Sequence, residues 1–363
     1  MKIILRFLLL TVVAGSSLLA VPRFALMEDV NCVSCHSFQG GGAGRAQYGK
    51  DYIRESLVMK DIAYPWVNED SEFPVYIGFD TRYEIVVNNG EDLRHFPMQL
   101  SLYAGAEFGS AIAHAEVNRI IGEYRVTGGL RYEGLPLESS VSVAHELPIM
   151  GWRIDDHTLF SRGGNFVPVG LQREGLPYTP FIEPPTLLEL DSAPIIGLEF
   201  SLMIGTAFLD QTEIAESGVF TASKISYSYS GDLFSAQTGL AYLREGELSN
   251  AVASWGVASN GFVWLGEVSQ ITNWPQENLS NIALLHQVSY RVIQGVDLIA
   301  RYEYFDQDKD LLTGSIQRSS FGFELFPIPG IELKLSYRHS QLDLPDETPD
   351  SQGQFIGQVH FFM

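Results

Sequence analysis

Charge, cysteine and long apolar runs are all scarce in this chain of 363 residues, and each scarcity excludes a class of protein. Charged residues make up only 18%, and 44 Asp and Glu outweigh 23 Lys and Arg. Nucleic acid is therefore excluded as a partner, because binding to phosphates requires positive charge. Only two cysteines are present, which excludes a framework of several disulfides. Hydrophobic residues still make up 45%, which excludes a disordered chain.

The first twenty residues have the composition of a secretory signal peptide. Lys2 and Arg6 give a positive start, an apolar run follows, and small residues near Ala20 supply a cleavage site. The alternative is an uncleaved membrane anchor, but the run is short and no stop-transfer pattern follows it. Beyond residue 20 no stretch of about 18 apolar residues occurs, so no second helical span is expected. We predict that residues 1–20 are removed and that the mature chain works outside the cytoplasm.

Further along the chain, apolar and polar residues alternate with a period of two, the pattern of a half-buried β-strand. Over residues 75–87 one face is apolar or aromatic, and the other carries Asp80, Arg82 and Glu84. The stretch 96–108 repeats this pattern. Strands of this length with one charged face are typical of a transmembrane β-barrel, whose outside meets lipid and whose lumen meets water.

Ten further strands are expected between residue 195 and the C-terminus. They begin near Ile195, Val219, Leu233, Ala251, Phe262, Ile282, Val296, Gly314, Ile331 and Gln354. Short breaks, such as 230–232 and 294–295, alternate with longer polar breaks, such as 273–281 and 343–353. Outer-membrane barrels show this alternation of short periplasmic turns and longer extracellular loops. The long breaks are therefore expected to face outward from the cell.

Prolines and a Gly163-Gly164 pair interrupt the alternation between residues 110 and 194. We expect four strands there and a loop folded into the lumen around residues 171–190. The total is then about 16 strands, with about 14 as the alternative, and a barrel of this size keeps an aqueous lumen. A secreted soluble β-sandwich or β-helix is the alternative fold. However, 16 Tyr and 22 Phe are more typical of aromatic girdles at two lipid interfaces.

We therefore predict an all-β fold: an antiparallel barrel of the bacterial outer membrane over residues 73–363, preceded by a short segment over residues 21–72. A chain of about 50 residues is near the size limit for burying a core unaided. We expect this segment to dock in the lumen or at its periplasmic mouth. Independent tumbling of the segment in relaxation measurements would contradict that expectation.

The chemistry of the sequence lies in this short segment, in the run C-V-S-C-H at residues 32–36. The C-x-x-C-H spacing is the attachment motif of c-type haem, in which two thiols bond to the haem and the adjacent imidazole becomes the proximal iron ligand. A disulfide is the main alternative, but a thioredoxin-like site needs a βαβ context. A zinc site needs four ligands, and no Cys or His falls between residues 37 and 94. We expect Cys32, Cys35 and His36 to hold one covalent haem c.

The second axial ligand of the iron is less well defined by the sequence. Met59 is the first choice, because it follows the motif on a stretch, residues 51–59, whose composition suits a helix. The other candidates are Met27, Lys50, Lys60, His95 and Met98. The remaining alternative is an open sixth position. The glycine-rich run 40–44 either wraps close to the haem, with Arg45 or Lys50 near the propionates, or forms a flexible loop.

These features together resemble a known family. The signal peptide, one C-x-x-C-H motif between P-R-F-A-L at 22–26 and Y-G-K at 48–50, and the barrel resemble the fused outer-membrane cytochrome-porins, best known from iron-oxidising bacteria. The resemblance implies that Cys32 and Cys35 bind the haem and that His36 is its proximal ligand. It also implies electron transfer across the outer membrane between an external donor, ferrous iron in the best-known members, and a periplasmic electron carrier.

A second class of function stays open: a solute porin whose haem is a sensor or a peroxidase-like centre. An open sixth coordination position favours this alternative, whereas a bound Met or His favours electron transfer. The acidic stretches 306–310 and 343–350 either attract cations or are ordinary solvated loops. His114, His145 and His157 are candidates for the lumen wall in either case.

Overall fold

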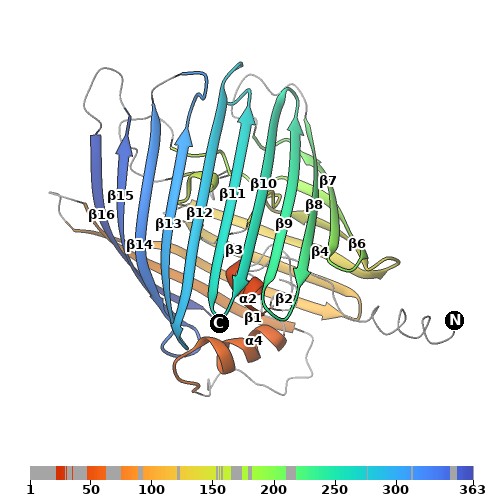
Figure 1. Ribbon diagram of the computed structural model, residues 1–363. Coiled ribbons are helices and arrows are strands. Elements are labelled where there is room, and N and C mark those ends of the chain that lie inside the picture. The colour runs from red at the N-terminus through yellow and green to blue at the C-terminus, as the bar shows by residue number, and fades with distance from the viewer. Residues whose placement is uncertain are drawn as a thin grey trace.

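A closed barrel of sixteen antiparallel strands makes up most of the chain, as the ribbon of the computed structural model shows (Figure 1). Each strand pairs with its neighbours in the sequence, and β1 (Val75–Asn88) closes the barrel against β16 (Asp350–Phe362). The expected fold and strand number are therefore confirmed. The residues that the structure describes are 22–28, 30, 35, 47–62, 75–88, 93–120, 123–152, 154, 156, 158–164, 174–178, 182–209, 218–275, 277–311, 314–343 and 350–362.

The remaining strands lie close to their expected positions. They are β2 (Arg94–Phe108), β3 (Ala111–Ile120), β4 (Glu123–Leu135), β5 (Ser139–His145), β6 (Thr186–Ile195), β7 (Leu198–Thr206), β8 (Val219–Ser230), β9 (Ser235–Glu245), β10 (Leu248–Ser259), β11 (Phe262–Thr272), β12 (Ser280–Ile293), β13 (Val296–Asp306), β14 (Ser315–Leu325) and β15 (Ile331–Leu342). Short helical elements accompany them, among them α2 (Pro22–Glu28), α4 (Gln47–Tyr52), the π-helix η1 (Ile53–Leu57) and the 3₁₀-helix η2 (Phe160–Arg162). Within the described part of the chain, none of the helices has the length and apolarity to cross a membrane.

The two ends of the barrel differ in their connections. One end, called the short-turn end, carries the connections 109–110, 136–138, 196–197, 231–234, 260–261, 294–295 and 326–330. The opposite end, called the long-loop end, carries the connections 146–185, 207–218, 273–279, 307–314 and 343–349 together with three shorter ones. The alternation of short and long breaks is confirmed. The helix α2 lies inside the barrel in its lower part, and α4 lies below the short-turn end (Figure 1).

The loop that enters the lumen differs from the prediction at both ends. Residues 171–190 were expected, but the connection already begins after His145, and β6 begins at Thr186. Pro184 and Pro185 cannot donate ladder hydrogen bonds, so pairing starts directly after them. This connection, called the inward loop, reaches the opposite wall, because the backbone N–H of Phe160 donates to Glu303 of β13 at 3.1 Å.

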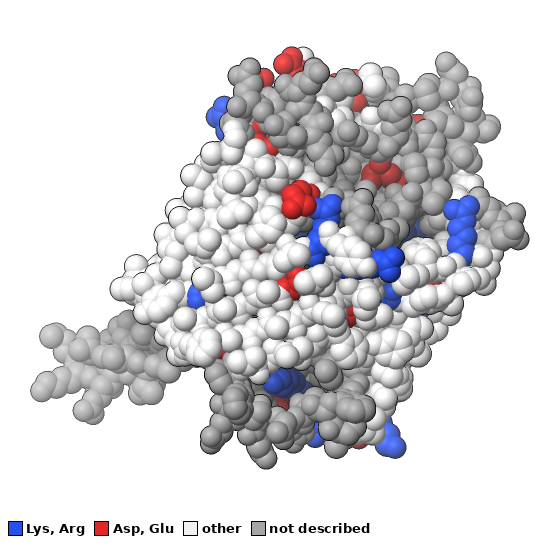
Figure 2. Space-filling view, turned by 180° about the vertical axis from the view of Figure 1, so that it is seen from behind, with Lys and Arg blue, Asp and Glu red and all other residues white. Residues whose placement is uncertain are grey.

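Exposure along the strands is inverted relative to a soluble protein. In β2, Ser101 is fully buried, whereas its neighbours Leu100 and Leu102 are 45% and 61% exposed. Seen from behind, the lower part of the wall carries few charged side chains, and Lys, Arg, Asp and Glu gather around a hollow above it and at the two ends (Figure 2). Apolar residues thus face outward and polar residues face the lumen, as in a barrel that spans lipid.

Candidate functional site in the barrel lumen

A cavity of about 410 Å³ occupies the lumen, within the range of about 300–1,000 Å³ that is typical of ligand pockets. Residues from three parts of the chain line it: Cys35 and Tyr52 from the N-terminal segment, Ile149 from the inward loop, and His114 and Lys334 from the wall. The second cysteine of the C-x-x-C-H motif therefore borders this cavity inside the barrel. Cys32 and His36 lie outside the described residues.

Apolar side chains surround Cys35. It is half-buried and packs in one cluster with Ala25 and Met27 of α2 and with Ile149 and Ile154 of the inward loop. The same cluster includes Leu26 and Trp152, together with Val263 and Leu265, which point inward from β11. The indole N–H of Trp152 donates to the backbone carbonyls of Gly266 at 2.9 Å and Trp255 at 3.2 Å. The surroundings of Cys35 thus combine the N-terminal segment, the inward loop and the barrel wall.

Helix α4 approaches the backbone of Cys35 at Gly49. A Cβ atom on Gly49 would lie closer than 3.0 Å to the carbonyl oxygen, the carbonyl carbon and the Cα of Cys35. Backbone atoms cannot yield as a flexible side chain does. Glycine is therefore the residue that this packing of α4 on Cys35 requires.

This contact makes Gly49→Ala a sharp test of how the segment is assembled. We expect Gly49→Ala to push α4 away from Cys35, at a cost of about 1–3 kcal/mol or more for the overpacked contact. Limited proteolysis of residues 22–62 measures the release. The matched control is Lys50→Ala, because Lys50 is the exposed neighbour of Gly49 on the same helix. Equal protease resistance of the two variants would contradict the prediction.

A chain of alternating charges runs along the lumen wall and includes one residue of the N-terminal segment. Its members in spatial order are Arg82, Asp80, His360, Glu332, Lys334, Glu324, Arg23, Asp297 and Arg291. Arg23 of α2 forms an ion pair with Glu324 of β14 and lies 3.7 Å from Asp297 of β13. Burial disfavours the charge of Arg23, yet the two carboxylates raise its pKa above the ordinary value. Arg23 is thus a buried anchor of α2.

Contacts at the rim hold the rest of the segment to the short-turn end. The Arg291 guanidinium donates to the Tyr52 hydroxyl at 3.2 Å, and burial raises the pKa of Tyr52 to about 12. The Gln294 amide donates to the carbonyl of Glu55 at 2.9 Å. The backbone N–H of Met59 donates to the carbonyl of Phe326 at 2.8 Å.

Glu28 makes this docking depend on pH. Burial raises the pKa of its carboxyl, and the charge of Arg291 and a hydrogen bond with Tyr48 offset that rise only in part. When the pH is below the ordinary pKa, a carboxyl with a raised pKa is protonated and contributes to the stability of the docked state. This contribution is lost as the pH rises through the raised pKa. We expect Glu28→Gln to flatten this part of the pH dependence, measured as protease resistance of residues 22–62 from about pH 4 to about pH 8. An unchanged profile would contradict the assignment.

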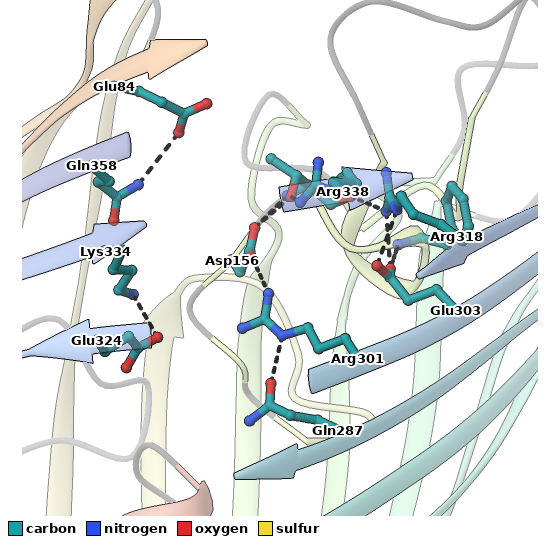
Figure 3. Close-up of polar contacts among 12 residues, drawn as sticks. Glu84, Asp156, Gln287, Arg301, Glu303, Arg318, Glu324, Lys334, Arg338 and Gln358 are labelled. Atoms are coloured by element: carbon teal, nitrogen blue, oxygen red, sulfur yellow. Dashed lines mark hydrogen bonds and ion pairs between the residues drawn. The ribbon is translucent and has the colours of Figure 1, made fainter. Parts of the chain in front are cut away.

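Arginines of three adjacent strands hold the inward loop (Figure 3). Arg318 of β14 donates to both carboxylate oxygens of Glu303, at 3.0 and 2.9 Å, and to the carbonyl of Thr158 at 2.5 Å. Arg338 of β15 donates to the Thr158 hydroxyl at 2.7 Å. Arg301 of β13 forms an ion pair with Asp156. These contacts keep the loop across the lumen on the long-loop side of α2.

Met59, the first choice for the second haem ligand, lies at the rim rather than on the cavity. Its side chain is 45% exposed, it packs against Gly295, and it is absent from the described cavity lining. Met27 packs in the cluster around Cys35, and Lys50 and Lys60 are exposed. Met98 borders a smaller space beside Gln358.

The histidines and acidic stretches singled out in the sequence are dispersed. His114 lines the cavity, His145 lies 3.6 Å from Glu183, and His95 forms a hydrogen bond with Tyr83. His157 lies outside the described residues. Asp306 and Asp308 accept hydrogen bonds from backbone N–H groups two residues further on. Among the residues that the structure describes, no group of three or more His, Cys, Asp or Glu is placed to hold a metal ion.

Two contributors to the site, Arg23 and Trp152, were missed in the sequence. Arg23 is the lone cation within the apolar run P-R-F-A-L-M, and an unpaired charge in such a run was the available signal for a buried ion pair. Trp152 offers no comparable signal, because its partners lie more than 100 residues away in β10 and β11. Packing between distant segments leaves no local pattern.

The described residues meet the needs of a c-type haem in this cavity. The Cys35 side chain borders it, and the cluster around Cys35 supplies apolar contacts. The lining also includes Arg82 and Arg125, whose guanidinium groups suit the carboxylates of haem propionates. An apolar cluster around the thiol, together with guanidinium groups in the lining, suits an amphipathic macrocycle.

Comparison with known proteins bears on the barrel. No family model matches the sequence, and no curated protein matches it. Solved structures similar to this chain include the anion-selective porin from Comamonas acidovorans, with a TM-score of 0.53, 12% identity, and coverage of 80% of this chain and 99% of that one. The outer membrane channel DcaP of Acinetobacter baumannii has a TM-score of 0.54, 11% identity, and coverage of 80% and 97%. OmpF of Salmonella typhi, in complex with daunomycin, has a TM-score of 0.55, 11% identity, and coverage of 80% and 97%. At these identities the likeness establishes the fold alone, a porin-like barrel.

Proposed function

We propose that this chain holds one covalent haem c in the lumen cavity of an outer-membrane barrel and passes electrons across the membrane through it. The observation that carries the proposal is the position of Cys35. The second cysteine of a C-x-x-C-H motif borders a cavity inside a porin-like barrel and packs against both the inward loop and α2. A haem attached there lies within the barrel rather than on a tether outside it.

Each part of the site has a role in this proposal. Cys32 and Cys35 bond covalently to the haem, His36 is the proximal ligand, and Arg82 and Arg125 neutralise the propionates. The apolar side chains of Met27, Ile149 and Ile154 exclude water from the site, and the exclusion of water tunes the reduction potential of the haem. When bound, the haem supplies one-electron chemistry.

The barrel explains how one haem serves partners on two sides. The apolar band of such a barrel is about 25 Å tall, so a haem outside the lumen lies far from one of the two partners. A haem inside the lumen shortens that path, and water in the lumen lets a donor approach without crossing lipid. We propose a soluble external donor, with ferrous iron as the first to test, and a periplasmic electron carrier as its partner.

An optical spectrum of protein exported with c-type haem maturation tests the proposal. We expect a haem that stays attached after denaturation and shows sharp α and β bands on reduction. Cys35→Ser removes one of the two covalent bonds and is expected to lower haem retention on a denaturing gel severely. Met27→Leu is the matched control, because it keeps an apolar side chain of similar volume in the same cluster. Wild-type protein without haem would refute the proposal.

A second candidate function is a solute porin with a haem sensor or peroxidase-like centre. The porin-like neighbours favour it, and one of them is an anion-selective porin. Conductance and ion selectivity in planar bilayers separate the two candidates. A large steady anion current through the wild-type protein supports the porin, whereas rapid reduction of the haem by ferrous iron with little current supports electron transfer.

A further inference from the structure

We infer that His114 of the barrel wall is the second axial ligand of the haem in the lumen cavity. The inference rests on the proposed function, because it requires a haem attached at Cys35. It replaces a ligand from the N-terminal segment with one from the barrel, so that the haem is held between the two parts of the chain. Four observations lead to His114.

First, the iron ligand has to come from the lining of the cavity that Cys35 borders. The described lining contains His114, His360 and Met150 as its His and Met residues. Imidazole and thioether are the usual partners of a proximal histidine in electron-transfer haems. Met27 and Met59 of the N-terminal segment are not part of the described lining, so neither meets the requirement that the ligand come from that lining.

Second, both nitrogens of His360 are already engaged. Its Nδ1 lies 2.7 Å from a Glu332 carboxylate oxygen, and its Nε2 lies 3.0 Å from a carboxylate oxygen of Asp80. Two flanking carboxylates stabilise a ring that keeps both protons, and such a ring has no lone pair for iron. His360 therefore belongs to the alternating-charge chain of the wall.

Third, the side chain of Met150 is committed to packing. It is 5% exposed and lies in the cluster that joins the inward loop to the wall, with Leu248 and Ile271 among its members. Turning the thioether towards iron would leave a void in that cluster, and such a void destabilises the packing.

Fourth, the wall residues paired with His114 carry no side chains of their own. Its partners on the two neighbouring strands are Gly105 of β2 and Gly129 of β4. The imidazole thus stands between two residues without side chains, on a strand that faces the cavity.

A second residue is placed to orient the ring. The Tyr76 hydroxyl occupies the space that a Cβ on Gly105 would take, and Gly105 is also the cross-strand partner of His114. An iron-bound histidine is normally fixed by a hydrogen bond to its other ring nitrogen. Tyr76 is therefore assigned as a positioning residue for His114.

Optical and magnetic circular dichroism spectra of the full-length haem protein test the ligand. We expect a low-spin spectrum with two imidazole ligands and without a methionine-to-iron charge-transfer band. His114→Ala should convert the haem to high spin, and added imidazole should restore the low-spin form. His114→Met should keep the low-spin state, introduce the charge-transfer band and raise the reduction potential. Tyr76→Phe should leave the spin state unchanged and shift the potential.

Two control variants and the wild-type spectrum complete the test. His286→Ala alters a histidine of β12 that stacks on Trp264 of β11, and Met59→Ala alters the rim methionine. Both variants should leave the spectrum unchanged. A low-spin spectrum in folded His114→Ala, or a change in Met59→Ala instead, would overturn the inference while leaving the haem in place. A methionine band in the wild-type protein would overturn it without any variant. Wild-type protein without haem would overturn the proposed function and the inference together.

Discussion

Replacing Arg23 with methionine is expected to release the N-terminal segment from the lumen and to raise the conductance of the barrel. Arg23 is 4% exposed and provides the cation between Glu324 and Asp297. Methionine keeps much of the side-chain length but leaves two buried carboxylates with one cation fewer. Removing one partner of a buried ion pair costs about 3–5 kcal/mol. A loss of this size is comparable to what a segment of about 40 residues can gain by docking.

Two measurements follow this release. Protease access reports whether residues 22–62 leave the barrel, and planar-bilayer recording reports whether the lumen then conducts. Arg54→Met is the matched control, since Arg54 pairs with Asp61 at 3.2 Å and both side chains are more than 30% exposed. Exposed pairs contribute about 0.2–1 kcal/mol, so this control should change neither readout.

A double variant shows whether the effect arises from the charge. Glu324→Gln in the Arg23→Met background removes one of the two carboxylates that lost the Arg23 cation and should restore part of the docking. If Arg23→Met remains protease resistant and closed to ions, then packing of Leu26 and Trp152 suffices to hold α2, and the ion pair is not its main anchor.

The fold was predictable because the alternation of apolar and polar residues in each strand reflects the lipid on one side of it and the water on the other. Alternation in residues such as 75–87 and 96–108 follows from a lumen that is wet and an outside that is lipid, and this pattern needs no knowledge of neighbouring strands. The error came where the pattern is interrupted. Pro184 and Pro185 mark the true end of the inward loop. The predicted loop, 171–190, ends five residues too late, because β6 is short and half its residues are polar or small, and it begins 25 residues too late.

The site was predictable only in its covalent part. The C-x-x-C-H spacing is local in sequence, so Cys32, Cys35 and His36 can be assigned as haem-binding residues without a fold. Which side chains surround Cys35 depends on how the inward loop and α2 meet inside the barrel, and this involves Ile149, more than 100 residues away. Met59 illustrates the limit, because its position along the chain suits a ligand while its place at the rim beside Gly295 does not bring it to the cavity.

Replacing Arg318 with methionine should free the inward loop while leaving the N-terminal segment docked. Arg318 is fully buried, donates to both oxygens of Glu303 and to the Thr158 carbonyl, and lies 3.9 Å from the centre of the Phe160 ring. Its loss leaves the Glu303 carboxylate buried without its cation, at a cost of about 3–5 kcal/mol. The strand ladder of β13 to β15 is untouched, so the loss falls mainly on the loop.

The expected signature is local rather than global. Thermal unfolding of the barrel in detergent should begin at lower temperature, and bilayer recordings should show frequent current fluctuations as the loop moves in the lumen. Residues 22–62 should stay protease resistant, because Arg23, Tyr52 and Met59 make their contacts with other parts of the wall and rim. Arg244→Met is the control, as Arg244 is exposed and donates to the carbonyl of Gly246 at the long-loop end. Release of the N-terminal segment in Arg318→Met would instead mean that loop and segment dock as one unit, with the cluster around Cys35 as their common support.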